Sequence, residues 1–191
     1  ILATNQRYGV RIPLYVMTSE ATDADTRAYF QENDYLGLAA DDVRIFKQGT
    51  MPAVDSATGN LLLSSKDSLA LSPDGHGGTV AALQRNRCLS DARDRGVRYL
   101  AYIQVDNPLA NLCDPTLVGH HLLSESEMTT QVVRKRHALE KVGNVVLTDG
   151  TVQIIEYSDL PASAAEAVDQ QGDLRLWAGS IGVHVIDVDF L

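Results

Sequence analysis

The 191-residue sequence has little of what membrane-spanning or zinc-binding proteins contain. No apolar run approaches the ~20 residues that a membrane-spanning helix needs. The two cysteines, Cys88 and Cys113, lack zinc-type spacing, and no signal-peptide pattern is present. We therefore expect reduced thiols, no membrane partner and a cytoplasmic location.

Basic residues are also scarce, since 16 Lys and Arg stand against 25 Asp and Glu, for a net charge of -9. A nucleic-acid surface needs clustered Lys and Arg, so the balance argues against a nucleic-acid partner. Phosphate-containing ligands are still compatible with this negative net charge, because backbone N–H groups and Mg²⁺ can bind phosphate locally. The basic run at residues 134–136 is open to two interpretations, a phosphate contact or a solvated cluster.

Strand-like and helix-like segments alternate along the chain, which predicts a mixed sheet with helices on its faces. The length fits one domain. A polar Asp149-Gly150 pair between two apolar segments predicts a β-hairpin. The main expected elements are strands at 12–19, 43–48 and 97–105, helices at 24–33, 79–86, 89–95 and 114–124, and the hairpin strands 142–147 and 152–157.

A glycine-rich stretch, residues 72–78 (Ser-Pro-Asp-Gly-His-Gly-Gly), precedes an expected helix. Glycine lacks a Cβ, so a ligand can approach the backbone closely there. This glycine loop has neither the Gly-Lys-Ser/Thr ending of a Walker loop nor a GxGxxG pattern. Its interpretations are a backbone cradle for a nucleotide or a plain turn.

Asp106 stands at the end of the strand expected at 97–105. A carboxylate there can hold Mg²⁺ or a ribose hydroxyl, because ligands of open α/β sheets bind at strand ends. The alternative is an Asp that starts the turn before Pro108.

Two more polar residues follow expected strands. The amide of Gln48 can read a base edge, because it both donates and accepts hydrogen bonds. Glu156 can accept hydrogen bonds from two sugar hydroxyls. The alternative interpretation of Gln48 is an ordinary loop residue, and that of Glu156 is a solvated residue at the edge of the sheet. No Ser-His-Asp arrangement is recognisable.

Together these motifs resemble the UDP-sugar pyrophosphorylase family, most closely its UDP-N-acetylhexosamine branch. The resemblance covers essentially the whole chain, with the motifs in the same order. The matching stretches are 17–19, 48–49 with 51–53, 72–78, 105–109, 114–115, 132–133 with Lys135, 141–143, 156–158 and 178–179.

The resemblance implies a three-layer α/β/α fold with a mixed, mainly parallel sheet of the nucleotide-diphosphosugar transferase (Rossmann-like) type. It also implies the reaction of UTP with a sugar 1-phosphate to give UDP-sugar and pyrophosphate, with Mg²⁺. N-acetylglucosamine 1-phosphate is the expected sugar substrate, and a UDP-glucose-type enzyme is the alternative.

For the nucleotide, the resemblance implies that Gln48 and Gly75 contact uracil and that His76 faces the nucleotide or the sugar. Asp106 is implied as the metal ligand, nucleotide contact and catalytic residue. Position 76 is usually Asn in the acetylhexosamine branch and His in the UDP-glucose branch.

For the sugar, the resemblance implies contacts from Glu156, Gly179, Ser180 and His76. The family has Gly-Asn where this chain has Gly179-Ser180, so Ser180 departs from the pattern.

The family's glycine-rich phosphate loop with its Pro-Lys ending has no counterpart in residues 1–191, nor does its C-terminal basic segment. We therefore expect residues 1–191 to be the central part of one catalytic domain and to be inactive alone. Competing hypotheses are a non-catalytic sugar-nucleotide binding module and a glycosyltransferase. Glycosyltransferases of a related fold usually have an Asp-x-Asp motif after the central strand, whereas this chain has Asp106-Asn107-Pro108.

Overall fold

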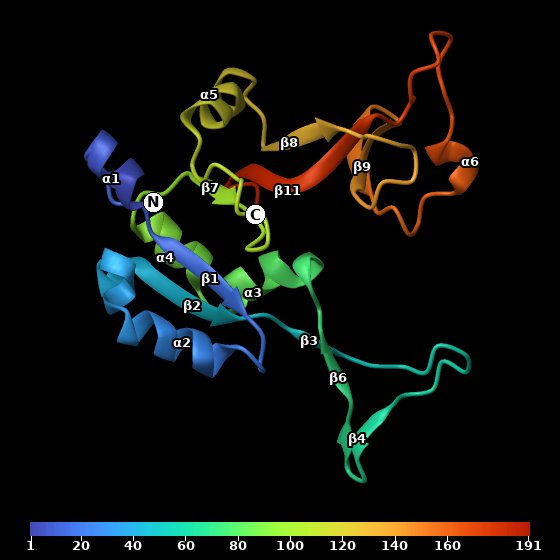
Figure 1. Cartoon of the computed structure of the whole chain (residues 1–191). Helices are drawn as coiled ribbons and strands as arrows, with labels where there is room; N and C mark the ends of the chain where they lie inside the picture. The colour runs from blue at the N-terminus through green and yellow to red at the C-terminus, as the bar shows by residue number, and fades with distance from the viewer. The chain divides into compact units, whose positions relative to one another are not determined.

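The structure, a computed structural model, describes residues 1–191 and separates into two compact units, Ile1–Arg98 and Tyr99–Leu191 (Figure 1). Each unit has its own sheet and buried residues, and each is described by itself below.

The first unit is built on two parallel strands, β1 (Leu14–Thr18) and β2 (Val43–Lys47). The helix between them, α2 (Asp23–Glu32), lies on one side of this pair, and α3 (Thr79–Arg85) and α4 (Cys88–Asp94) lie on the other (Figure 1). Apolar side chains from both layers are buried against the strands. They include Phe30 of α2, Leu83 of α3 and Leu89 of α4, and Phe46 of β2 is buried with them. The unit also contains α1 (Leu2–Tyr8), which is not among the expected elements, and the 3-10 turns η1 (Asp34–Gly37) and η2 (Ala40–Asp42).

A narrow antiparallel arm extends from this unit between β2 and α3 (Figure 1). In it β3 (Thr50–Pro52) pairs with β6 (Leu71–Pro73), and β4 (Leu63–Ser65) pairs with β5 (Ser68–Leu69). The arm leads into η3 (His76–Gly78), which directly precedes α3.

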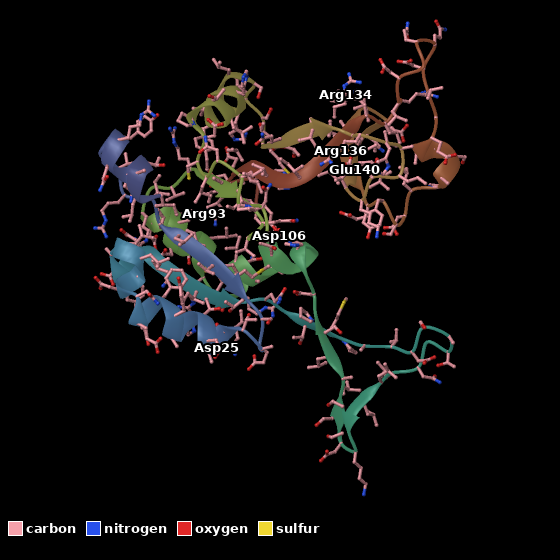
Figure 2. The ribbon with its side chains drawn as sticks, viewed as in Figure 1. Asp25, Arg93, Asp106, Arg134, Arg136 and Glu140 are labelled. Atoms are coloured by element: carbon pink, nitrogen blue, oxygen red, sulfur yellow. The ribbon has the colours of Figure 1, made fainter.

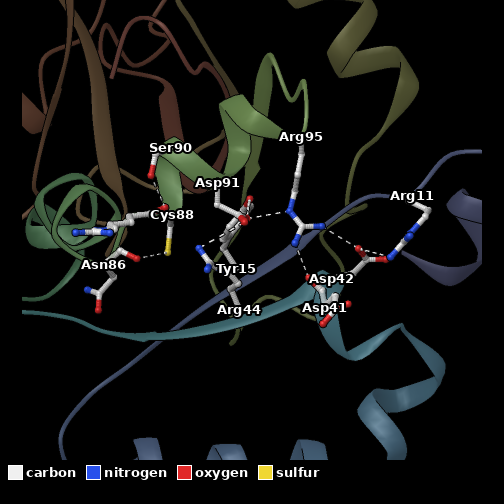
Figure 3. A network of polar contacts seen from close by, with 11 residues as sticks. Arg11, Tyr15, Asp41, Asp42, Arg44, Asn86, Cys88, Ser90, Asp91 and Arg95 are labelled. Atoms are coloured by element: carbon white, nitrogen blue, oxygen red, sulfur yellow. Dashed lines mark hydrogen bonds and ion pairs between the residues drawn. The ribbon is translucent and has the colours of Figure 1, made fainter.

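A polar network fixes the packing of the first unit (Figure 3). Asp42 is buried and accepts hydrogen bonds from Arg11 Nε and Nη2, both at 2.9 Å, and from Arg95 Nη1 at 3.1 Å. Arg95 also donates to Asp91 Oδ2 at 3.0 Å, and the Tyr15 hydroxyl donates to the same oxygen at 2.8 Å. The network therefore connects the residues before β1, η2 and α4.

The second unit is an antiparallel five-stranded sheet centred on β11 (Ala178–Asp187). β11 pairs with β7 (Tyr99–Tyr102), β8 (Met128–Arg134) and β9 (Gly143–Thr148), and β9 pairs with β10 (Thr151–Ile155). The helices are α5 (Pro115–Leu123) and α6 (Ala162–Ala165). Val183 and Val185 of β11 are almost completely buried.

The expected mixed α/β class is confirmed, but the predominance of parallel pairing is not. The only parallel pair is β1 with β2, and every other strand pairing is antiparallel. Sequence patterns show where apolar strands occur, whereas strand direction depends on which distant segment becomes the neighbour. No helix of the structure is both long and apolar enough to cross a bilayer.

Candidate functional site

Gln48 and the glycine loop meet in the first unit at the end of β2. The backbone N–H of Gln48 donates to Thr18 O at 2.8 Å, so Gln48 extends the parallel ladder by one residue. The next residue, Gly49, accepts a hydrogen bond from the backbone N–H of Asp74 at 3.1 Å. Gln48 and Gly75 are therefore each one residue away from the same backbone hydrogen bond. The structure brings these two expected nucleotide contacts together.

The glycine loop turns at Gly75, whose φ of 65° and ψ of -155° lie in a region that only glycine occupies readily. A Cβ at Gly75 or Gly77 would meet no atom within 4 Å, so open space faces both backbones. His76 begins η3 and is exposed. A close approach to the backbone is thus possible here, as the glycine-rich sequence predicts.

Asp106 lies in the second unit, in the turn after β7 (Figure 2). β7 ends at Tyr102, so the strand expected at 97–105 is too long by three residues at this end. The chain then turns, with Asn107 N–H donating to Gln104 O at 3.2 Å. Asp106 is exposed, and Val105 is 101% and Leu109 93% exposed. The prediction that the strand runs up to Asp106 is therefore wrong, and Asp106 lies in the turn that the alternative interpretation expects.

The expected sugar contacts of the second unit gather around Gly143. Register pairs Ser180 with Gly143 and Gly179 with Asn144, while Ile155, the residue before Glu156, also pairs with Asn144. A Cβ at Gly143 would lie 3.5 Å from Glu156 Oε1 and 3.6 Å from Ser180 Cβ. Residues of β9 and β11 and the residue after β10 thus form one group, the Gly143 cluster: Gly143, Glu156, Gly179 and Ser180.

A β-bulge begins directly after Ser180, because the pairing of β11 with β8 shifts register between Ser180 and Val183. Gly182, inside the bulge, has a φ of 67°, and its N–H donates to Ser180 Oγ at 3.4 Å. The side chain of Gln104 packs over it, with Cδ and Nε2 both 2.8 Å from the position of a Cβ. Gln104 thus connects the segment leading to Asp106 with the bulge beside Ser180. Bulges of this kind often redirect side chains beside binding sites.

Lys135 and Asn144 lie beside Gly179 of the Gly143 cluster, since Asn144 pairs with Gly179 and Lys135 Cγ is 3.4 Å from the Gly179 Cβ position. Neither is a site residue that the sequence patterns alone suggest. Both are buried, and Lys135 Nζ donates to Asn144 Oδ1 at 2.6 Å and to Ala138 O at 3.0 Å. Burial lowers the pKa of the Lys135 ammonium. The signal that sequence could have offered is weak, since Lys135 stands between two arginines in the basic run.

The two arginines of the basic run have acidic or aromatic neighbours (Figure 2). Arg134 lies over the Trp177 ring at 5.4 Å and 3.6 Å from Asp173 Oδ1. Arg136 Nε lies 3.6 Å from Glu140 Oε1. Both arginine side chains are largely exposed, which favours the solvated cluster of the two interpretations for positions 134 and 136. Lys135 differs, because it is buried.

In residues 1–191 no group of three or more His, Cys, Asp or Glu side chains is arranged so that it could hold a metal ion. Asp106 therefore stands alone as a candidate carboxylate ligand, exposed in its turn. A single hard oxygen ligand fits Mg²⁺ if nucleotide phosphates and water complete its coordination, which is the common mode in nucleotide enzymes.

The fold is that of a mixed α/β protein, and in each of its units polar residues lie beside glycines. Residues 1–179 match the UTP–glucose-1-phosphate uridylyltransferase family, and the chain belongs to this family.

Similar proteins are found in eukaryotes that are only distantly related to one another. The UDP-N-acetylglucosamine pyrophosphorylase of Saccharomyces cerevisiae is 40% identical over 182 residues, which are 95% of this chain and 38% of the yeast protein. The UDP-N-acetylhexosamine pyrophosphorylase-like protein 1 of Xenopus tropicalis is 38% identical over 98% of this chain and 37% of its own length. The crystal structure of the Trypanosoma brucei UDP-N-acetylglucosamine pyrophosphorylase with an inhibitor superposes with a TM-score of 0.85 at 28% identity. That match covers 98% of this chain and 38% of the trypanosomal one. The chain thus spans less than two fifths of the length of these relatives.

Proposed function

We propose that this chain carries the uracil- and sugar-binding surfaces of a uridylyltransferase. The enzyme would form a UDP-sugar and pyrophosphate from UTP and a sugar 1-phosphate. The observation that carries the proposal is the Gly143 cluster, in which Glu156 and Ser180 approach a backbone without a side chain. Membership of the family and the names of the relatives support the same reaction.

For the nucleotide, we assign Gln48 and Gly75 to uracil. The amide of Gln48 can donate to and accept from a base edge, and the open backbone at Gly75 offers a close approach. His76, exposed beside Gly75, would face the nucleotide or its sugar.

For the sugar, we assign Glu156, Gly179 and Ser180, together with His76. A carboxylate such as that of Glu156 accepts hydroxyl hydrogen bonds with charge assistance, which makes them stronger than neutral ones. The proposed substrate is N-acetylglucosamine 1-phosphate, because relatives with 36–40% identity are named for UDP-N-acetylglucosamine.

The chemistry needs no protein nucleophile. An oxygen of the sugar phosphate attacks the α-phosphorus of UTP, the new O–P bond forms, and the bond to the β-phosphate oxygen breaks to release pyrophosphate. Catalysis is then mainly positioning and charge neutralisation, which the protein supplies through oriented groups. Mg²⁺, when bound to phosphate and Asp106, would offset the phosphate charge. Asp106 would act by holding it and the nucleotide in place.

In the complete enzyme we propose that these residues form the central part of the catalytic domain, within the three-layer α/β/α arrangement. The cytoplasm is the proposed location.

The test is a pyrophosphate-release assay on the full-length protein with UTP, Mg²⁺ and a panel of sugar 1-phosphates. We expect turnover with N-acetylglucosamine 1-phosphate in preference to glucose 1-phosphate. Preference for glucose 1-phosphate would establish the UDP-glucose-type alternative, consistent with His at position 76. Binding of UDP-sugar without turnover of any sugar 1-phosphate would identify a binding module.

A further inference from the structure

The carboxyl group of Asp74 lies between two glycines of the first unit. A Cβ at Gly78 would collide with Asp74 Cγ and both carboxyl oxygens. A Cβ at Gly49 would collide with Asp74 Oδ2 and would lie 3.0 Å from Cγ and 3.2 Å from Arg85 Nη2. Asp74 therefore occupies the space that side chains at positions 49 and 78 would need.

Neither glycine is required by its backbone conformation. Gly78 has a φ of -79° and a ψ of -6°, which any residue can adopt, and Gly49 is not among the positive-φ glycines. Gly75 differs, because its φ of 65° itself demands glycine while its Cβ position is open. The glycines of this region thus serve different purposes, and those at 49 and 78 accommodate Asp74.

The position of Asp74 is also unfavourable in free energy. Its Oδ1 atom is buried and has no hydrogen-bond partner, and the nearby Thr79 Oγ1 is likewise buried and unpartnered. Leaving a buried carboxylate oxygen unpaired is unfavourable, and such groups are rare in native proteins. A residue kept at such a position calls for a role that a small apolar side chain would not fill.

We propose that Asp74 is a positioning residue for the nucleotide. Through its backbone N–H to Gly49 O and its carboxyl group packed on Gly49 and Gly78, it holds Gln48 at a set distance from Gly75 and His76. This inference rests on the proposed function, because it concerns the two segments assigned to UTP. The side chain acts by its shape, so an isosteric amide can replace it.

The test is a set of variants of the full-length enzyme, assayed for KM and kcat with UTP and with the sugar 1-phosphate. Asp74→Ala and Gly78→Ala should each raise KM for UTP by about tenfold or more, because either change lets the segment of Gln48 move relative to that of Gly75, and misplaced binding groups lose affinity. KM for the sugar 1-phosphate should rise by less than KM for UTP, since His76 is the only proposed sugar contact in the segments that Asp74 positions. Asp74→Asn should restore KM for UTP to within about threefold of the wild-type value, because its shape is conserved.

A double-mutant cycle provides the sharper criterion. In Asp74→Ala/Gly78→Ala the new methyl group at 78 no longer meets a carboxyl group, so the double variant should bind UTP no worse than Asp74→Ala alone. Contacting residues show such non-additivity, whereas independent ones add. Gly119→Ala is the matched control, since a Cβ there meets nothing within 4 Å and the residue lies inside α5.

Additive effects of the two substitutions, or an unchanged KM for UTP in Asp74→Ala, would overturn the inference while leaving the proposed function intact. So would an Asp74→Asn variant as impaired as Asp74→Ala. If Gly78→Ala does not fold, recovery of soluble protein in the double variant supports the inference, and failure to recover it argues against it. A wild-type enzyme that neither binds nor uses UTP would instead refute the proposed function, and the inference with it.

Discussion

Single residues decide the shape of the proposed sugar site. Gly143 is the clearest case, because a Cβ there would lie 2.8 Å from Ile154 Cγ2, closer than side chains tolerate. Gly179 is similar, since its Cβ position is 2.8 Å from Val142 Cγ2. The absence of a side chain at both glycines allows the neighbouring chain segments to pack closely. Glu156 and Ser180 therefore both lie beside Gly143.

We expect Glu156→Gln to weaken sugar 1-phosphate binding by about 10- to 100-fold in KM, because a hydrogen bond to a charged group is worth about 1.5–3 kcal/mol. KM for UTP should stay near its wild-type value. The measurement is steady-state kinetics with each substrate varied in turn. Glu166→Gln is the matched control, because Glu166 is exposed at the end of α6. Equal kinetic effects of both substitutions would contradict the assignment of Glu156.

At the scale of elements, the network around Asp42 determines how the first unit packs (Figure 3). The Asp42 side chain is only 5% exposed, while Arg11 is 69% and Arg95 31% exposed. The carboxylate is thus nearly buried, and its cationic partners are partly solvated.

Asp42→Ala should lower the free energy of unfolding by about 2–3 kcal/mol, less than for a fully buried ion pair because water can solvate the arginines left behind. Urea denaturation measures this change. Asp41→Ala is the control, since Asp41 is exposed and contributes only its backbone oxygen to Arg95. A loss of stability as large for Asp41→Ala would show that the network is not the cause.

The start of α5 depends on a side-chain cap. Asp114 Oδ1 accepts from Thr116 N–H at 2.9 Å, and Pro115 occupies the first turn. Asp114→Ala should therefore cost about 1 kcal/mol of stability, whereas Asp114→Asn, which keeps the acceptor, should cost little. Thermal denaturation and hydrogen exchange in the first turn of α5 would measure the difference. Equal effects of Ala and Asn would argue against capping.

At the scale of the whole molecule, acid should destabilise the second unit through His184. Its Nδ1 lies 3.0 Å from Thr130 Oγ1, its ring stacks on Tyr102 at 5.6 Å, and burial lowers its pKa below 6.5. Between 6.5 and that lower value the unfolded chain binds a proton that the folded chain does not. The free energy of unfolding therefore decreases as the pH falls through this window and recovers as the pH rises.

The measurement is urea denaturation at a series of pH values from about 8 to 5, a range that spans the ordinary titration of histidine. His184→Gln should flatten the part of the pH dependence that belongs to His184. An unchanged slope in this variant would assign the acid sensitivity to other groups.

Local patterns predict much of the fold well. The Asp149-Gly150 hairpin is confirmed, with both residues at positive φ, because a two-residue turn requires that conformation. The helices expected at 24–33 and 114–124 are confirmed within a residue or two. Asp114 caps the second helix as expected, whereas Thr22, the N-cap residue of the first, makes no side-chain capping bond. The strand expected at 97–105 is too long at both ends, because its apolar residues continue into an exposed turn.

The sequence by itself determined the family resemblance, the glycine loop and the strand-end positions of Gln48 and Glu156, because these depend on residue types within a few positions of one another. Only the tertiary structure decided that Glu156 and Ser180 both lie beside Gly143 and that Lys135 is hydrogen-bonded to Asn144. It also decided that the carboxyl group of Asp74 fills the space beside Gly49 and Gly78. The contacts around Gly143 follow from strand pairing and register, which no local pattern specifies. Even the close approach of Asp74 to Gly78, four residues later, depends on how the loop folds in three dimensions.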